Sequence, residues 1–588
     1  MVRAFRISCG FTAVLALALL LPAGANAQSG GGATPTREEL DRAGQALPDS
    51  SGGPRLTVEG GVERAPCPLA DPRFAGVTVN FADVRFDHLG DIDPAILRDS
   101  WADMAGQDLP IASVCEIRDR AATALRQMGY LAAVQVPPQR IEKGGTVVFD
   151  VLLAKLVSVQ VRGDAGNSEK LIADSLEALK DEPVFNAHQA ERRLLLLRDL
   201  PGYDVRLALR PAGTAPGEVV GEVSVTRQQI QLAANVQNLG SHEVGRWGGL
   251  LRLQINDATG MGDSTVLSVF NTAQTREQTV LQASHSMALN ADGLRLAGNY
   301  TYAWSKPDVV NGKIKSRTQI ASAELSYPLI RRQSITLLGT AGLEIVDQDV
   351  DFANNPLNRD KLRVFYGKLD FETIDPESLS STLGYTANEP KYRLGGSLEI
   401  RQGISGLGAS SGCKNPFTCL LSRPEGDPSA FVVRANGYAE YRPVPEVTVA
   451  VAPRLQYSAD ALLSYEEISG GNYTVGRGYD PGAIIGDSGA GATVELRYGS
   501  VLPKSPKDLA LQPFAFFDAA YVWNRDSQFD GLNPQKIYSA GGGIRGSWGN
   551  RARFELTVAA PLKKTIFQQE RGDVRVLFSI TTQLVPWR

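Results

Sequence analysis

The feature that most constrains the fold is a two-residue alternation of apolar and polar side chains over residues 227–588. Between Ile230 and Val236, every second residue is apolar, and Gln and Asn supply most of the residues between and beside them. Near the C-terminus, Val574, Val576 and Phe578 alternate with Arg575 and Ser579 in the same way. Segments of about ten residues with this pattern, separated by turns, are typical of transmembrane β-strands.

The length of this region sets the number of strands. At roughly 22 residues for a strand and its connection, residues 227–588 hold about 16 strands. A closed barrel satisfies every backbone polar group inside a lipid bilayer. A soluble β-sandwich is the alternative, but it needs neither so many strands nor aromatic strand ends such as Tyr521 and Trp523. We therefore expect a transmembrane β-barrel of about 16 antiparallel strands.

The N-terminus carries an export signal. Arg3 and Arg6 precede a short apolar segment from Phe11 to Leu21, and Ala25-Asn26-Ala27 is a small-residue cleavage site. This arrangement predicts a signal peptide over residues 1–27. A transmembrane anchor is the alternative, but the apolar segment is too short to span a bilayer.

The cysteine count agrees with an oxidising compartment. Beyond the signal peptide the chain has four cysteines: Cys67, Cys115, Cys413 and Cys419. Local pairing predicts the disulfides Cys67–Cys115 and Cys413–Cys419. A metal site is the alternative, but close Cys-x-x-Cys spacing and supporting histidines are missing, so we predict no metal.

Residues 28–65 are rich in Gly, Ser and Pro, with one segment of helical pattern. Thr36 and Glu39 have the spacing of a capping box, and Leu40, Ala43 and Leu47 follow at roughly helical intervals. A short helix on a flexible tether is expected here, and a disordered linker is the alternative.

Residues 66–226 contain two copies of one β-α-α-β-β pattern. In the first copy, Asp93 is expected to cap the first helix, and Gly129 ends the second. In the second copy, the helices begin near Ser168 and Asn186. The strands are expected at 77–86, 131–136 and 146–153, and then at 156–161, 204–209 and 219–225. Such a sheet has a free edge that can pair with an extended chain; a structural spacer is the alternative.

Several motifs occur in a consistent order along the chain. They are Gly129-Tyr130 with Val136-Pro137-Pro138-Gln139, Leu200-Pro201-Gly202, Asn238-Leu239-Gly240-Ser241 with Gly245-Arg246-Trp247, Gly260-Met261-Gly262-Asp263, and Val475-Gly476-Arg477-Gly478-Tyr479-Asp480-Pro481-Gly482 with Gly486-Asp487-Ser488-Gly489. With these motifs the chain resembles the two-partner secretion transporters of the haemolysin secretion/activation type, and residues 66–226 resemble their two POTRA domains.

The resemblance implies a domain order. Residues 28–65 would hold a plug helix and linker, residues 66–154 and 155–226 two periplasmic POTRA domains, and residues 227–588 the outer-membrane barrel. Arg477, Gly478 and Tyr479 would form the tip of a sixth extracellular loop that folds back into the lumen. The resemblance pairs Arg477 with Asp518, and strand alternation also turns Asp518 away from Phe517 and toward the polar lumen.

The implied function is export of a specific secreted protein through the outer membrane of a Gram-negative bacterium, without ATP. The POTRA domains would bind the partner's N-terminal secretion domain, and the protein would act as a monomer in outer-membrane lipid after insertion by the barrel assembly machinery. The net charge of −4 suggests no nucleic-acid partner, and we predict no cofactor and no catalytic residue. The alternatives are an insertase of the same superfamily, a passive pore, which would leave residues 66–226 unexplained, and an enzyme.

Overall fold

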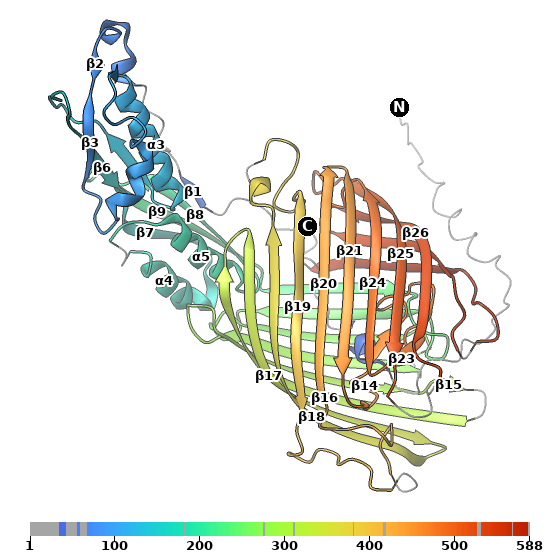
Figure 1. Cartoon of the computed structure of the whole chain (residues 1–588). Coiled ribbons are helices and arrows are strands. Elements are labelled where there is room, and N and C mark those ends of the chain that lie inside the picture. Colours follow the sequence, from blue (N-terminus) through green and yellow to red (C-terminus); the bar gives the residue numbers. More distant parts are fainter. Residues whose placement is uncertain are drawn as a thin grey trace, which may run out of the picture.

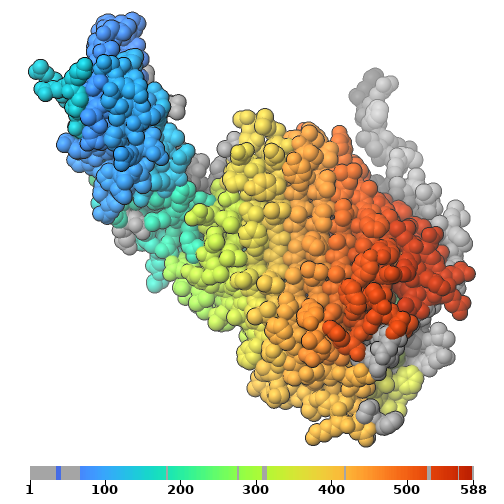
Figure 2. All heavy atoms as spheres, in the orientation of Figure 1, coloured from blue at the N-terminus to red at the C-terminus, as the bar shows by residue number. Residues whose placement is uncertain are grey.

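The computed structural model describes residues 35–42, 56–58 and 67–585, apart from 181–182, 275–276, 310–311, 380, 416–418, 526–530 and 567. The predicted signal peptide, and residues 43–47 of the predicted plug helix, lie outside the described residues. The chain forms a β-barrel and a pair of α/β units that project from one of its ends (Figure 1). The space-filling view shows these units as an arm beside the barrel (Figure 2).

The barrel is closed and antiparallel, and its sixteen strands confirm the predicted architecture. β10 pairs with both β11 and β28, which closes the ring. The short strand β15 (Asp308–Val309) pairs only with the start of β16. The barrel strands are β10 (Ile230–Gln237), β11 (Gly248–Asn256), β12 (Ser264–Thr272), β13 (Gln278–Ala288), β14 (Arg295–Ser305), β16 (Gly312–Arg331), β17 (Ile335–Phe352), β18 (Asn355–Ile374), β19 (Tyr392–Gly403), β20 (Phe431–Val444), β21 (Val447–Ser458), β24 (Ser488–Tyr498), β25 (Leu509–Trp523), β26 (Gln535–Trp548), β27 (Ala552–Pro561) and β28 (Arg575–Val585).

The alternation in sequence corresponds to the two faces of the barrel wall. Ile230 and Val236 are 49% and 48% exposed on the outer face, where lipid would cover them. Asp518 and Gln512 are buried on the inner face, and Phe517 between them in sequence is exposed outside. None of the helices within the described residues combines the length and apolar character that a membrane-spanning helix needs.

The first α/β unit has a sheet in the order β3-β6-β5, covered by helix α3 (Ser113–Gln127). Its core contains Phe81, Ile117, Leu125 and Phe149, all fully buried. The predicted strand 77–86 is wrong in one respect, because it breaks at Asn80 into β2 and β3. Asp93 does cap a helix, but this helix is a 3-10 helix over Pro94–Ser100. The strands are β2 (Thr78–Val79), β3 (Phe81–Asp87), β4 (Leu109–Pro110), β5 (Ala132–Gln135) and β6 (Gly145–Leu153).

The second α/β unit has a sheet in the order β1-β8-β9-β7, which includes a strand that the sequence pattern did not predict. β1 (Leu56–Val58) belongs to the predicted linker and pairs in parallel with β8 (Tyr203–Pro211). The edge of β8 is therefore occupied by the chain itself. The remaining elements are β7 (Lys155–Gly163), α4 (Glu169–Glu177), α5 (Ala187–Arg198) and β9 (Glu218–Arg227).

Buried and paired charges fix the second unit against the rim of the barrel. Asp257, in the turn between β11 and β12, is fully buried, accepts the backbone N–H of Asn167 at 2.7 Å, and pairs with Arg227 at 3.0 Å. A second ion pair joins Asp199 to Arg331 of β16 at 2.7 Å. The turns β11–β12 and β16–β17 therefore lie at the end of the barrel that faces this unit, which the predicted domain order makes the periplasmic end, and the loops at the other end are expected to be extracellular.

Both predicted disulfides are present. Cys67–Cys115 ties the start of the first α/β unit to helix α3, with the Cα atoms 5.8 Å apart. Cys413–Cys419 closes a small ring within the extracellular loop between β19 and β20, with the Cα atoms 5.5 Å apart.

Candidate functional site: a loop and a helix inside the barrel

The sixth extracellular loop, residues 459–487 between β21 and β24, folds back into the lumen; we call it loop 6. It contains two short paired strands, β22 (Ile468–Gly470) and β23 (Ile484–Gly486). Its apolar residues pack on the inner wall, where Val475, Tyr479 and Ile484 contact Val522 and Ile537. The loop is therefore an ordered part of the lumen.

Arg477 at the loop tip forms a two-point ion pair with Asp518 of β25. Its Nη2 lies 2.9 Å from Asp518 Oδ1, its Nε lies 3.2 Å from Oδ2, and its backbone N–H donates to Oδ2 at 2.9 Å. Asp518 is fully buried and also accepts hydroxyl hydrogen bonds from Thr493 and Ser539. Bidentate pairs of this kind fix orientation as well as contributing energy.

Close contacts on both sides of Arg477 explain why glycine precedes and follows it. Gly476 has a φ of +124°, and a Cβ there would meet Ile537 at 2.6 Å. A Cβ on Gly478 would meet the backbone nitrogen of Pro561 at 2.7 Å, so the loop approaches β27 too closely for a side chain. Tyr479 is fully buried, and its hydroxyl lies 2.6 Å from the carbonyl oxygen of Lys563.

Two partners of Arg477 were not predicted from the sequence. Its Nη1 lies 2.6 Å from Glu495 of β24, a carboxylate that also pairs with Arg497 at 2.7 Å and Arg545 at 2.8 Å. Its guanidinium carbon stands 3.7 Å from the ring centroid of Phe516, in a cation–π contact. Phe516 lies two residues before Asp518 on the same strand face, so alternation alone could have found it.

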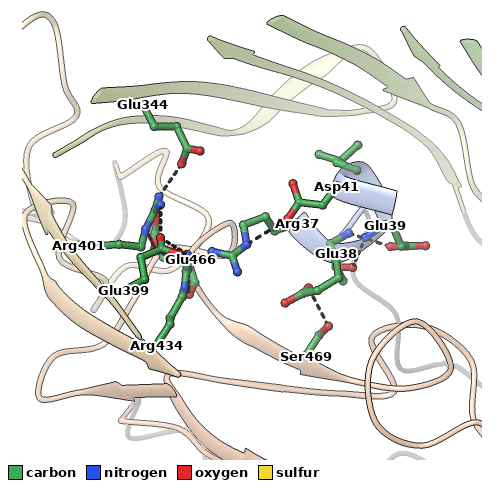
Figure 3. Close-up of polar contacts among 12 residues, drawn as sticks. Arg37, Glu38, Glu39, Asp41, Glu344, Glu399, Arg401, Arg434, Glu466 and Ser469 are labelled. Atoms are coloured by element: carbon green, nitrogen blue, oxygen red, sulfur yellow. Dashed lines mark hydrogen bonds and ion pairs between the residues drawn. The ribbon is translucent and has the colours of Figure 1, made fainter. Parts of the chain in front are cut away.

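Helix α2 (Arg37–Arg42) lies inside the barrel, as Figure 1 shows through the strands. Its predicted capping box is confirmed, because the N–H of Thr36 donates to Glu39 at 2.8 Å and the N–H of Glu39 donates to Thr36 Oγ1 at 3.3 Å. Glu38 pairs with Arg454 of β21 and accepts the hydroxyl of Ser469, from loop 6, at 2.9 Å (Figure 3). The helix thus contacts the wall and loop 6 together.

A second group of charges holds the base of loop 6 to the wall. Glu466 of the loop lies 2.6 Å from both Arg401 of β19 and Arg434 of β20 (Figure 3). Arg401 also pairs with Glu344 of β17 at 2.5 Å. These side chains are buried, so loss of Glu466 would leave two buried arginines with fewer carboxylate partners.

A cavity of about 910 Å³ opens between the loop tip and the periplasmic turns. Arg477, Glu495 and Arg545 line it together with further charged residues, including Glu440, Arg497 and Glu555. The lumen thus has a charged vestibule, which ends at loop 6. This geometry is that of a barrel whose own loop 6 and helix α2 occupy the lumen.

Sequence comparison assigns the family. The family model of the haemolysin secretion/activation proteins ShlB/FhaC/HecB matches residues 220–546, more than half of the chain, and the chain therefore belongs to this family. No curated protein sequence gives a significant match. The protein is a two-partner secretion transporter of the outer membrane, with its α/β units in the periplasm.

Two solved structures show the same fold. CdiB from Escherichia coli is 15% identical, over 93% of this chain and 96% of that chain, with a TM-score of 0.68. CdiB from Acinetobacter baumannii is also 15% identical, over 86% of this chain and 90% of that chain, with a TM-score of 0.62. Transporters of this family bind a secreted partner protein.

Proposed function

We propose that residues 66–226 form two POTRA domains, divided near residue 154, and that they capture the secreted partner in the periplasm by β-augmentation at β8. The observation that supports this proposal is the pairing of Leu56–Val58 with β8, in the register Leu56–Leu207 to Val58–Leu209. This edge accepts an extended segment of the chain itself, and backbone pairing of this kind tolerates different sequences. The partner's N-terminal secretion domain would replace β1.

After capture, the partner enters the charged vestibule as an unfolded chain and leaves through the lumen. Helix α2 must leave first, and the Arg477–Asp518 pair holds loop 6 in the position that allows export. Folding of the partner outside the cell gives the direction of transport, without nucleotide. The transporter acts as a monomer, after the barrel assembly machinery has inserted it into outer-membrane lipid.

A disulfide that locks β1 onto β8 tests the capture step. Thr57 and Ala208 are register partners, so Thr57→Cys with Ala208→Cys joins the two strands. The control pair is Arg162→Cys with Ser224→Cys, register partners on the exposed face of β7 and β9, which do not need to separate. The partner is first identified as the large protein that disappears from the culture medium when the gene is deleted.

Export of this protein is expected to stop in the oxidised β1–β8 variant and to return on mild reduction. The control pair, and the wild type under the same reductant, should export normally. Normal export from the oxidised β1–β8 variant would contradict capture at this edge. Broad loss of other barrel proteins after gene deletion would instead support an insertase.

A further inference from the structure

A row of apolar residues runs along the inner wall, on seven neighbouring strands, among the polar residues that the lumen of such a barrel is expected to have. At one level of the wall, the residues directly opposite one another on four neighbouring strands, β11 to β14, are apolar. The register pairs are Leu250–Phe270, Phe270–Val280 and Val280–Ala303. Val280 and Ala303 are each 1% exposed. Their sequence neighbours Leu251, Val269 and Leu281 face the opposite, outer side of the wall.

The apolar row continues on the next three strands. Ile320 of β16 pairs with Val346 of β17, which pairs with Leu362 of β18. Ala303 is opposite Thr318, and Ile320 is the next residue on the same face of β16, so the two rows adjoin. We call this set the apolar belt: Leu250, Phe270, Val280, Ala303, Ile320, Val346 and Leu362. Opposed side chains in a sheet stand about 5 Å apart, so the belt is a continuous surface.

The rest of the lumen contrasts with this surface. The vestibule wall formed by β19 to β27 carries Arg393, Glu440, Arg497, Arg545 and Glu555. Charge suits a water-filled channel, but an apolar arc in such a channel is unfavourable unless something covers it. Covering the belt with other apolar groups is therefore favourable.

In the closed state the occupants come from the chain itself. Leu40 of α2 packs on the belt and is 1% exposed. Leu421 of the β19–β20 loop, and Leu463 and Tyr465 of loop 6, pack beside it. All four lie on segments that do not belong to the wall, and α2 must clear the lumen before a polypeptide can pass.

We propose that the apolar belt is a binding surface for the polypeptide in transit. An extended segment with aliphatic or aromatic side chains at alternate positions takes the place of Leu40, because its period of two presents one apolar face to the belt. Its polar face turns to the charged half of the lumen. This proposal rests on passage of the partner through the lumen, as proposed above.

Peptide block of single channels tests the belt. The full-length protein is reconstituted in planar bilayers, as wild type and as Glu38→Ala, which weakens the seat of α2 and leaves the belt intact. Two synthetic peptides of equal length are applied from the periplasmic side. One alternates Val with Thr and Asn, and in the other each Val is replaced by Gln. The measured quantity is the duration of each current block.

Three variants link the block to the belt. Val346→Thr places a hydroxyl within the belt at nearly constant volume and should shorten the blocks by the Val peptide about five-fold, which is about 1 kcal/mol. Thr318→Val extends the belt and should lengthen them. Val269→Thr is the matched control on the outer face and should change nothing.

The outcomes separate the two proposals. Longer blocks by the Val peptide, shortened only for that peptide by Val346→Thr, support the belt as a binding surface. Equal block durations for the two peptides overturn it, and so does a Val346→Thr variant that opens more often without a change in block duration, because the belt would then only seal the closed pore. If neither peptide blocks the current, passage through the lumen is contradicted as well.

Discussion

The pair between Arg477 and Asp518 gives the sharpest prediction about loop 6. In Arg477→Ala, Asp518 keeps its hydroxyl donors but loses its cationic partner, and Glu495 loses one of three. Both carboxylates are buried. Removing one partner of a buried ion pair costs about 3 to 5 kcal/mol. At about 1.4 kcal/mol for each factor of ten, the outward position of loop 6 gains roughly a hundred-fold to a few thousand-fold in population.

Chymotrypsin on intact cells measures this shift, because the enzyme cleaves after aromatic residues and Tyr479 is fully buried in the lumen. The cleavage rate within loop 6 follows the population of the exposed state when the loop moves faster than it is cleaved. We expect Arg477→Ala to be cleaved far faster than the wild type, to insert normally into the membrane, and to export no partner. Arg477→Lys keeps the charge without the two-point contact and should fall between them.

A matched control separates this effect from the general loss of an arginine. Arg317 of β16 pairs with Asp349 of β17 at 2.9 Å, but its side chain is 50% exposed. Because exposed pairs contribute about 0 to 1 kcal/mol, Arg317→Ala should leave cleavage and export nearly unchanged. If Arg477→Ala resists chymotrypsin like the wild type and still exports the partner, the pair does not hold loop 6 for transport.

Three further predictions concern α2 and the first α/β unit. Glu38→Ala leaves Arg454 without its partner and should raise the ion conductance of planar bilayers toward that of a variant lacking residues 28–54; an unchanged conductance would show that α2 does not close the pore. Replacing Cys67 and Cys115 by serine opens a cross-link spanning 48 residues, and pulse proteolysis in urea should show the first unit destabilised by about 2 to 4 kcal/mol. The hydrogen bond from His88 to Asp150 raises the pKa of His88 above its ordinary 6.5, so this contact is complete below pH 6.5 and is lost as the pH rises through the raised pKa; in an NMR titration, Asp150→Asn should lower the midpoint toward the ordinary value.

The strands were predictable because lipid and lumen impose opposite demands on alternate residues. The wall between Ile230 and Val236 shows this rule directly, and the same rule placed Asp518 in the lumen. The pattern carries no such signal for β1. Its three residues, Leu56–Val58, form a strand because they pair with the edge of β8, which is far away in sequence. The type of the helix after Asp93 was not predictable either, because a cap and a proline mark where a helix begins and do not distinguish a 3-10 helix from an α-helix.

The loop site shows the same division. The Arg477–Asp518 contact followed from a family resemblance and from strand alternation together, whereas Glu495 did not. Glu495 occupies one of many polar lumenal positions, and nothing local distinguishes it from Glu440 or Glu555. Its place beside three arginines depends on how β24 and β26 align on the two sides of β25 and on where loop 6 turns. Register and loop path, rather than side-chain pattern, decide such a cluster.

The chain between α2 and β1 determines how far partner capture alone can release the plug. Thirteen residues separate Arg42 from Leu56, and loss of β1 from β8 would lengthen this tether to the 24 residues before Cys67. The effective concentration of the end of a tether that is longer than the distance it spans falls roughly as the −3/2 power of its length. Displacement of β1 therefore lowers the local concentration of α2 about 2.5-fold, or about 0.5 kcal/mol.

That change is small beside the contacts that seat α2, which include a buried ion pair from Glu38 and the burial of Leu40. A Gly/Ser insertion that doubles the tether is accordingly expected to raise the open probability of single channels less than three-fold, well below the effect of Glu38→Ala. A much larger effect of the insertion would mean that tether length controls release. The described part of α2, Arg37–Arg42, is too short to be a stable helix by itself in water, so its contacts in the lumen hold it there. The main force for release must then act where α2 is bound, and the polypeptide that competes for the apolar belt is positioned to supply it.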